Sequence, residues 1–130
     1  MIITVDTSAV LAVASGESTR LALTQAVRGA DLVAPASLPV EVGNALSAML
    51  KRDRITPADA DRVLVAYHQI PIRLVAVDLA RAVALAAQLG IYAYDAYVID
   101  CARTEGAPLL SLDGGQKQAA TEAGVSIHPY

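Results

Sequence analysis

Four acidic residues spread along the chain, Asp6, Glu41, Asp95 and Asp113, have the type and spacing to do chemistry together. Each stands in otherwise apolar sequence, where a predicted strand ends or a predicted helix begins. An ionised carboxylate is costly to bury unless a partner compensates its charge, and a divalent cation is a partner that several carboxylates can share. We therefore expect these acids to form one metal-dependent site.

The ion that suits such a set is Mg²⁺ or Mn²⁺, because hard cations prefer oxygen ligands and commonly keep some waters. A bound ion of this kind lowers the pKa of a water and directs it at a phosphodiester, so no side-chain nucleophile is needed. His68, His128 and Cys101 are too scattered to resemble a zinc set. Helix capping is an alternative explanation for Asp6 or Asp95 taken singly, but it does not explain Glu41.

Length and composition fit one domain over residues 1–130, with a core of small aliphatic side chains. Hydrophobic residues make up 55% of the chain and aromatic residues only 4%. The net charge is −3, yet setting the four acids aside leaves nine acidic residues beside ten basic ones, so partners of either charge stay open. No apolar run is long enough to span a membrane, and no signal peptide precedes the first strand, so we expect a cytoplasmic protein.

Hydrophobic patterns, caps and glycine stops predict alternating strands and helices along the whole chain. The Thr56-Pro57-Ala58-Asp59 stretch is the clearest helix start, with a cap, a proline at the first position and an acid in the first turn. Short apolar strands predict an α/β fold, with a mainly parallel sheet of about five strands and helices on both faces. The predicted strands are 2–5, 32–34, 72–77, 108–112 and 125–128, and the predicted helices are 7–14, 17–28, 38–52, 57–69, 79–89, 94–105 and 116–123.

Four stretches in the same order and spacing resemble the PIN-domain ribonucleases, most closely the VapC-type toxins of toxin–antitoxin pairs. These stretches are Ile3-Thr4-Val5-Asp6-Thr7-Ser8-Ala9, Glu41-Val42-Gly43-Asn44-Ala45-Leu46, Tyr94-Asp95-Ala96-Tyr97-Val98 and Leu110-Ser111-Leu112-Asp113. Each is weak alone, but their order and their spacing across nearly the whole chain make the resemblance specific.

The resemblance implies a single PIN-like domain and a Mg²⁺- or Mn²⁺-dependent endoribonuclease. Its acidic site would correspond to Asp6, Glu41, Asp95 and Asp113, which are both the catalytic and the metal-binding candidates. Thr7, Ser8, Asn44 and Ser111 would support that site, with Thr7 or Ser8 hydrogen-bonded within it. A cognate VapB-like antitoxin would cover the site, and two copies of the chain would form a homodimer.

Several further residues are candidate RNA contacts. Lys117 is poorly placed for the dipole of the helix that it begins, which favours a phosphate contact. Lys51 and Arg52 end a predicted helix, where favourable dipole charge is the simpler explanation. Tyr94 and Tyr97 flank Asp95 and could stack on unpaired bases, although core packing explains them equally well.

Asp100 follows Asp95 by five residues, so it points to another side of the same helix, and we expect a salt bridge or interface role rather than metal binding. The alternative to an enzyme is a catalytically silent PIN-fold module that acts only by binding an antitoxin or RNA. Retention of all four acids argues against that alternative.

Overall fold

A four-stranded parallel sheet in the order β3-β2-β1-β4 forms the centre of the computed structural model, which describes residues 1–130. Its strands are β1 (Ile2–Val5), β2 (Asp31–Pro35), β3 (Ile72–Val75) and β4 (Leu109–Leu110). β1 lies in the middle, and Thr4 pairs with Val33 on one side and Leu109 on the other. The predicted parallel α/β architecture is confirmed.

The prediction of a fifth strand over 125–128 is wrong. This segment makes one isolated bridge, between Ile127 and Leu109. Two backbone hydrogen bonds hold it there, from Leu109 N to Ser126 O and from His128 N to Leu109 O. Because β4 is only two residues long, it offers too short an edge for a longer ladder.

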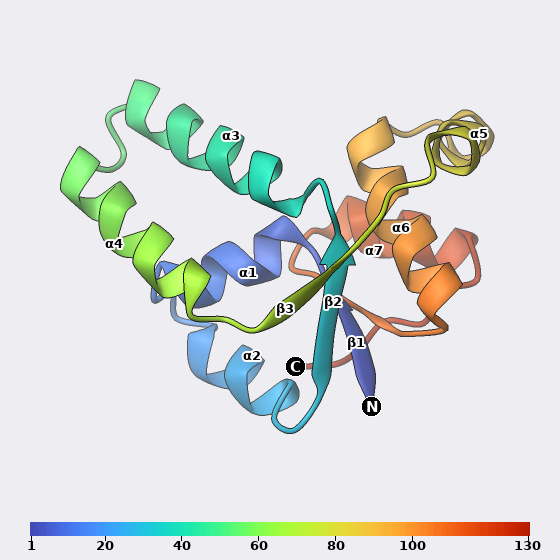
Figure 1. Ribbon diagram of the computed structural model, residues 1–130, viewed down its shortest axis with the longest axis horizontal. Helices are drawn as coiled ribbons and strands as arrows, with labels where there is room; N and C mark the ends of the chain where they lie inside the picture. Colours follow the sequence, from blue (N-terminus) through green and yellow to red (C-terminus); the bar gives the residue numbers. More distant parts are fainter.

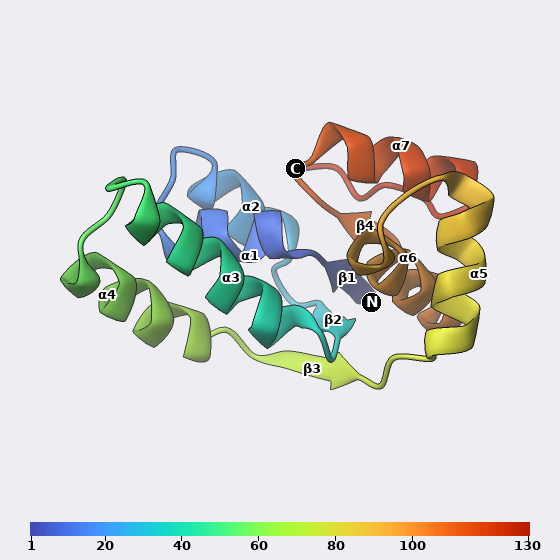
Figure 2. The same ribbon diagram turned by 90° about the horizontal axis from the view of Figure 1, so that it is seen from above.

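Seven helices cover the two faces of the sheet (Figures 1 and 2). One side holds α1 (Thr7–Ala14), α2 (Arg20–Ala26), α3 (Leu38–Lys51) and α4 (Pro57–His68), and the other holds α5 (Leu79–Leu89), α6 (Ala93–Glu105) and α7 (Gly114–Glu122). Each side has its own apolar cluster, centred on residues such as Val10 and Leu38 on the first and Leu85 and Ile99 on the second. No single helix is long and apolar enough to cross a membrane, and only the bent pair α5 and α6 passes such a test together.

Local capping chemistry explains where most of these helices begin. Thr56 and Asp59 form the expected capping box of α4, and Asp78 caps α5 through the backbone N–H of Arg81. The helix predicted over 17–28 is shorter, because Glu17 N bonds back to Ala12 O in the turn that ends α1. α2 therefore starts only at Arg20.

The chain order of the strands decides where a site can form. β2 and β3 extend the sheet to one side of β1, whereas β4 returns to the other side. Parallel sheets usually bind ligands beyond the carboxyl ends of the strands at such a reversal of chain order, which here are the ends of β1 and β4. Asp6 directly follows β1 and Asp113 lies three residues after β4, so both acids come after the carboxyl ends of these two strands.

Candidate active site

Asp6 is the most buried of the four acids, with 6% of its surface exposed. It caps α1, and its Oδ1 accepts hydrogen bonds from Ala9 N at 3.0 Å and from the Ser8 hydroxyl at 2.6 Å. Its Oδ2 accepts a hydrogen bond from the Ser111 hydroxyl. Burial raises the pKa of Asp6 above its ordinary value, the three hydrogen bonds lower it, and the charge of Asp113 raises it again. The net pKa is raised, so Asp6 holds a proton more readily than an exposed aspartate.

Ser8 and Ser111 join the ends of β1 and β4. Besides donating to Asp6, the Ser111 hydroxyl accepts from Asp113 N at 3.0 Å, and the Ser8 hydroxyl accepts from Leu112 N at 2.9 Å. The two hydroxyl oxygens lie 3.4 Å apart. One small network therefore fixes the first acid against the segment that carries the last one.

Asp113 and Asp95 begin the two helices on the other side of the sheet. Asp113 is exposed and caps α7, and its Oδ1 accepts from Gly115 N at 2.9 Å and from Gln116 N at 3.3 Å. Asp95 lies in the first turn of α6, and its carboxylate makes no hydrogen bond or ion pair. Burial raises the pKa of Asp95, and the charges of Asp113 and Asp6 raise it further.

Glu41 lies in the first turn of α3, which leaves the end of β2. Its Oε2 accepts a hydrogen bond from the Ser37 hydroxyl at 2.9 Å. Burial raises the pKa of Glu41, the hydroxyls of Ser37 and Thr7 lower it, and the charges of Asp6 and Asp95 raise it. Although the Thr7 hydroxyl lies near enough to affect the pKa of Glu41, it does not meet the geometry of a hydrogen bond. Thr7 Oγ1 is therefore buried without a hydrogen-bond partner.

The charge of at least one other acid of the four raises the pKa of each of Asp6, Glu41 and Asp95, so the four acids lie near one another. None of them takes part in the ion pairs of the protein. No three His, Cys, Asp or Glu side chains are arranged to hold a metal ion in this structure, and the metal site stays a prediction. Both oxygens of Asp6 and one of Asp113 are turned to hydroxyl and backbone donors, and like charges repel one another.

The donor chemistry of the site still fits Mg²⁺ or Mn²⁺. All four candidate ligands supply carboxylate oxygen, which hard cations prefer. The oxygens without a hydrogen-bond partner are both of Asp95, Oε1 of Glu41 and Oδ2 of Asp113. To bring three of them onto one ion, side chains must turn from their present positions.

The other predicted residues lie at various distances from the acids. Asn44 is exposed on α3, and its side chain makes no hydrogen bond with the acids. Lys51 and Arg52 end the same helix, ten residues beyond Glu41, which is about 15 Å at 1.5 Å per residue. Figures 1 and 2 show that this end of α3 reaches away from the sheet beside α4. Lys51 and Arg52 are therefore not part of the immediate acidic site.

Lys117 and the tyrosines flank the acids more closely in sequence. The Lys117 ammonium lies 5.5 Å from the ring centroid of Tyr130, so a cation–π contact already engages this charge. Tyr94 and Tyr97 form an edge-to-face pair with centroids 5.7 Å apart, and Tyr94 is 46% exposed. Tyr92, which caps α6, is 85% exposed.

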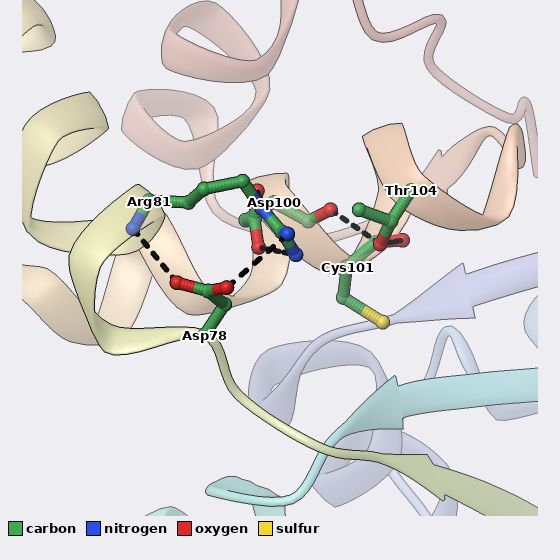
Figure 3. Close-up of polar contacts among 5 residues, drawn as sticks. All are labelled: Asp78, Arg81, Asp100, Cys101 and Thr104. Atoms are coloured by element: carbon green, nitrogen blue, oxygen red, sulfur yellow. Dashed lines mark hydrogen bonds and ion pairs between the residues drawn. The ribbon is translucent and has the colours of Figure 1, made fainter.

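Asp100 lies away from the acids and makes the salt bridge that the sequence suggested (Figure 3). Arg81 on α5 donates to both of its carboxylate oxygens, Nε to Oδ1 and an η-nitrogen to Oδ2, each at 3.1 Å. Arg81 also contacts Asp78 at 3.3 Å. The neighbouring Cys101 is buried, and burial raises its pKa to about 12, which suits a structural thiol rather than a nucleophile.

Gln116 is a residue near the acids that the sequence analysis missed. Its side chain is buried, with 4% exposed, and its Nε2 donates to the backbone carbonyl of Asp95 at 3.3 Å. The Gly114-Gly115-Gln116-Lys117-Gln118 stretch reads as a polar surface helix, so no local pattern distinguishes Gln116 from Gln118.

The acidic site is separate from an apolar cavity of about 380 Å³ bounded by α1, α2 and β2, which none of the four acids lines.

A profile of the PIN domain family matches residues 3–122. The chain belongs to the PIN domain family. A search of the curated proteins finds no significant match. Among solved structures, this PIN domain resembles PAE2754 from Pyrobaculum aerophilum with a TM-score of 0.70 and 22% identity, over 92% of this chain and 79% of the other.

Two further solved structures share the fold of this PIN domain across almost its full length. VapBC2 from Rickettsia felis, bound to a DNA fragment from its promoter, has a TM-score of 0.65 and 11% identity, over 98% of this chain and 97% of the other. VapC20 from Mycobacterium tuberculosis, described as a toxin that cleaves the sarcin–ricin loop, has a TM-score of 0.68 and 17% identity, over 98% and 99%. At these identities the likeness concerns the fold.

Proposed function

We propose that this PIN domain is a Mg²⁺- or Mn²⁺-dependent endoribonuclease and the toxin of a type II toxin–antitoxin pair. One observation carries the proposal: Asp6, Glu41, Asp95 and Asp113 lie at the carboxyl end of the sheet with raised pKa values at three of them and no cationic partner. Such unneutralised carboxylates are expected where a protein binds a divalent cation.

The residues would divide the work as follows. Asp95, Glu41 and Asp113 have oxygens without hydrogen-bond partners, and these would bind the ion. Asp6 would also bind it if the Ser8 or Ser111 hydroxyl turned away from its carboxylate. Ser8 and Ser111 hold Asp6 in place. The bound ion would supply an activated water and offset charge on the phosphate oxygens during attack.

Partners follow from the same proposal. The Rickettsia felis structure pairs a protein of this fold with an antitoxin, which supports a VapB-like partner here. RNA is the substrate that the family and the Mycobacterium tuberculosis toxin favour. Exposed apolar side chains on α5, Leu79 at 62% and Val83 at 56%, would give a homodimer an apolar contact surface. The cytoplasm is the compartment that belongs to this proposal.

A catalytically silent binding module is the second candidate, because no three acidic side chains are arranged to hold an ion. The change Asp95→Asn tests both. We expect the variant to keep the fold and to lose RNA cleavage and the heat of Mn²⁺ binding in isothermal titration. Equal, weak heats from both proteins, with no cleavage by the wild type, would favour the silent module. Sequencing the 5′ ends of RNAs cut in cells after induction would then identify the substrate.

A further inference from the structure

Gln116 carries an unusual combination of burial and incomplete hydrogen bonding. Its side chain lies in the first turn of α7 with 4% exposed, and its Nε2 donates to Asp95 O at 3.3 Å. Its Oε1 is buried and has no partner. A buried amide with one unmet acceptor is destabilising relative to an apolar side chain of the same shape. Packing alone therefore does not explain why a glutamine, and not an apolar residue, is buried at position 116.

The same residue contacts both acid-bearing segments on this side of the sheet. Its backbone N–H donates to Asp113 Oδ1 at 3.3 Å, while its side chain holds the carbonyl of Asp95. No other side chain makes a hydrogen bond to any atom of Asp95. Gln116 is thus the one direct polar link between the start of α6 and the start of α7.

α7 contributes only alanines to the apolar cluster on this side of the sheet, whereas α6 contributes Val98 and Ile99 as well as alanines. Ala96 on α6 and Ala119 and Ala120 on α7 are buried in the same cluster. Alanine allows helices to approach closely but offers no long side chain that interlocks with the neighbouring surface. A directional hydrogen bond near the helix ends can supply the missing restraint.

We infer that Gln116 is a positioning residue, which sets the placement of the Asp95 carboxylate relative to Asp113. The inference rests on the proposed function, because the placement matters only if these two acids share an ion or a substrate. Gln116 itself touches neither reacting atoms nor the carboxylate of Asp95. Its effect passes through the backbone of α6.

The test compares Gln116→Met with Gln118→Met. Methionine keeps the length of the side chain and removes both amide atoms, and Gln118 is an exposed amide on the same helix that bonds only to Glu122 at 3.5 Å. We would measure kcat and KM on a defined RNA in Mg²⁺, Mn²⁺ affinity by isothermal titration, and the melting temperature in EDTA. For Gln116→Met we expect about a fivefold fall in kcat, weaker Mn²⁺ binding and an unchanged KM. Its melting temperature should stay equal or rise, because the unmet acceptor is gone.

A second variant, Gln116→His, keeps an N–H donor at a similar reach and should recover part of the lost kcat. If Gln116→Met matches the wild type in kcat and Mn²⁺ affinity, the inference is wrong while the proposed function stands. A fall in melting temperature that accompanies equal losses in both Gln116 variants would show a packing role and would also overturn it. If the wild type neither cleaves RNA nor binds Mn²⁺, the proposed function fails, and the inference fails with it.

Discussion

Two groups of acidic residues in this protein are treated in opposite ways. On the outer surface of the helices, Asp59, Asp78, Asp100 and Glu105 each contact an arginine. At the carboxyl end of the sheet, Asp6, Glu41, Asp95 and Asp113 have no basic partner. The chain therefore has arginines to neutralise acids, yet none of them contacts the four acids at the sheet end.

Hydroxyls and backbone N–H groups replace the missing arginines at the sheet end. Ser8, Ser111 and Ala9 N stabilise the Asp6 carboxylate through hydrogen bonds, yet they leave its charge in place. The fold therefore stabilises this carboxylate without a positive charge beside it. A neutralising cation would then have to come from outside the chain.

The largest expected effect is that a change in one group lowers RNA cleavage, whereas a change in the other group lowers the melting temperature. Asp6→Asn should lower RNA cleavage more than about 100-fold, because loss of a metal ligand removes several kcal/mol of transition-state stabilisation. Asp100→Asn should leave cleavage within a fewfold of the wild type and should lower the melting temperature, since it breaks the pair with Arg81. Initial rates on one RNA and thermal melts of both variants give the comparison. Retained cleavage in Asp6→Asn, with contaminating nuclease excluded, would contradict the assignment.

Addition of Mn²⁺ should stabilise the protein through the sheet end alone. At 100 times its dissociation constant, an ion that binds only the folded state raises the free energy of unfolding by about 2.7 kcal/mol. Urea unfolding with and without Mn²⁺ would show this increment in the wild type and in Asp100→Asn. Its absence in the wild type would mean that the acids do not bind this ion, whereas its absence only in Asp95→Asn would support them as ligands.

Removal of an arginine should matter most where its partner is shielded from water. Arg81→Gln leaves Asp100, only 13% exposed, without its bidentate partner, whereas Arg62→Gln leaves Asp59, which is 38% exposed. We expect the melting temperature to fall more in Arg81→Gln. Equal melting temperatures would show that the pair in Figure 3 adds no stability beyond that of an ordinary surface pair.

The smallest expected effect is a pH dependence of the metal-free protein. Burial raises the folded-state pKa of Asp6, Glu41 and Asp95, so the folded protein takes up protons before the unfolded chain does. Stability in EDTA should therefore rise as the pH falls from neutral toward 4.5, the ordinary pKa of a glutamate. With Mn²⁺ bound the rise should disappear, because protons then compete with the ion. Denaturant midpoints at several pH values would show a flat or falling trend if the raised pKa values are wrong.

Features set by neighbouring residues could be predicted from the sequence. The capping box at Thr56 depends on side chains within three residues of the helix start, and it is confirmed. Asp78 caps α5 through an equally local bond, to the backbone N–H of Arg81. The four acids were identifiable because a carboxylate at the edge of an apolar segment is conspicuous. Ser111 and Ser8 were found through the family resemblance, and the structure places both on Asp6.

Features that depend on distant partners were not predicted correctly. The alternation over 125–128 suggested a strand, but β4 supplies only two residues to pair with. Gln116 looks like its exposed neighbour Gln118 until α6 is packed over it. The orientation of each carboxylate also escaped prediction, since it depends on hydroxyl and N–H donors that the fold brings in from other segments.

The bond between Ser111 and Asp6 joins residues that are 105 positions apart. At 5–20 residues per second, the ribosome needs roughly 5–20 s to make the stretch between them. During that interval β1 has its first acid but not β4, so a growing chain has no complete catalytic centre. If the proposed activity is correct, the enzyme can cut RNA only after the segment that carries Ser111 and Asp113 has emerged from the ribosome.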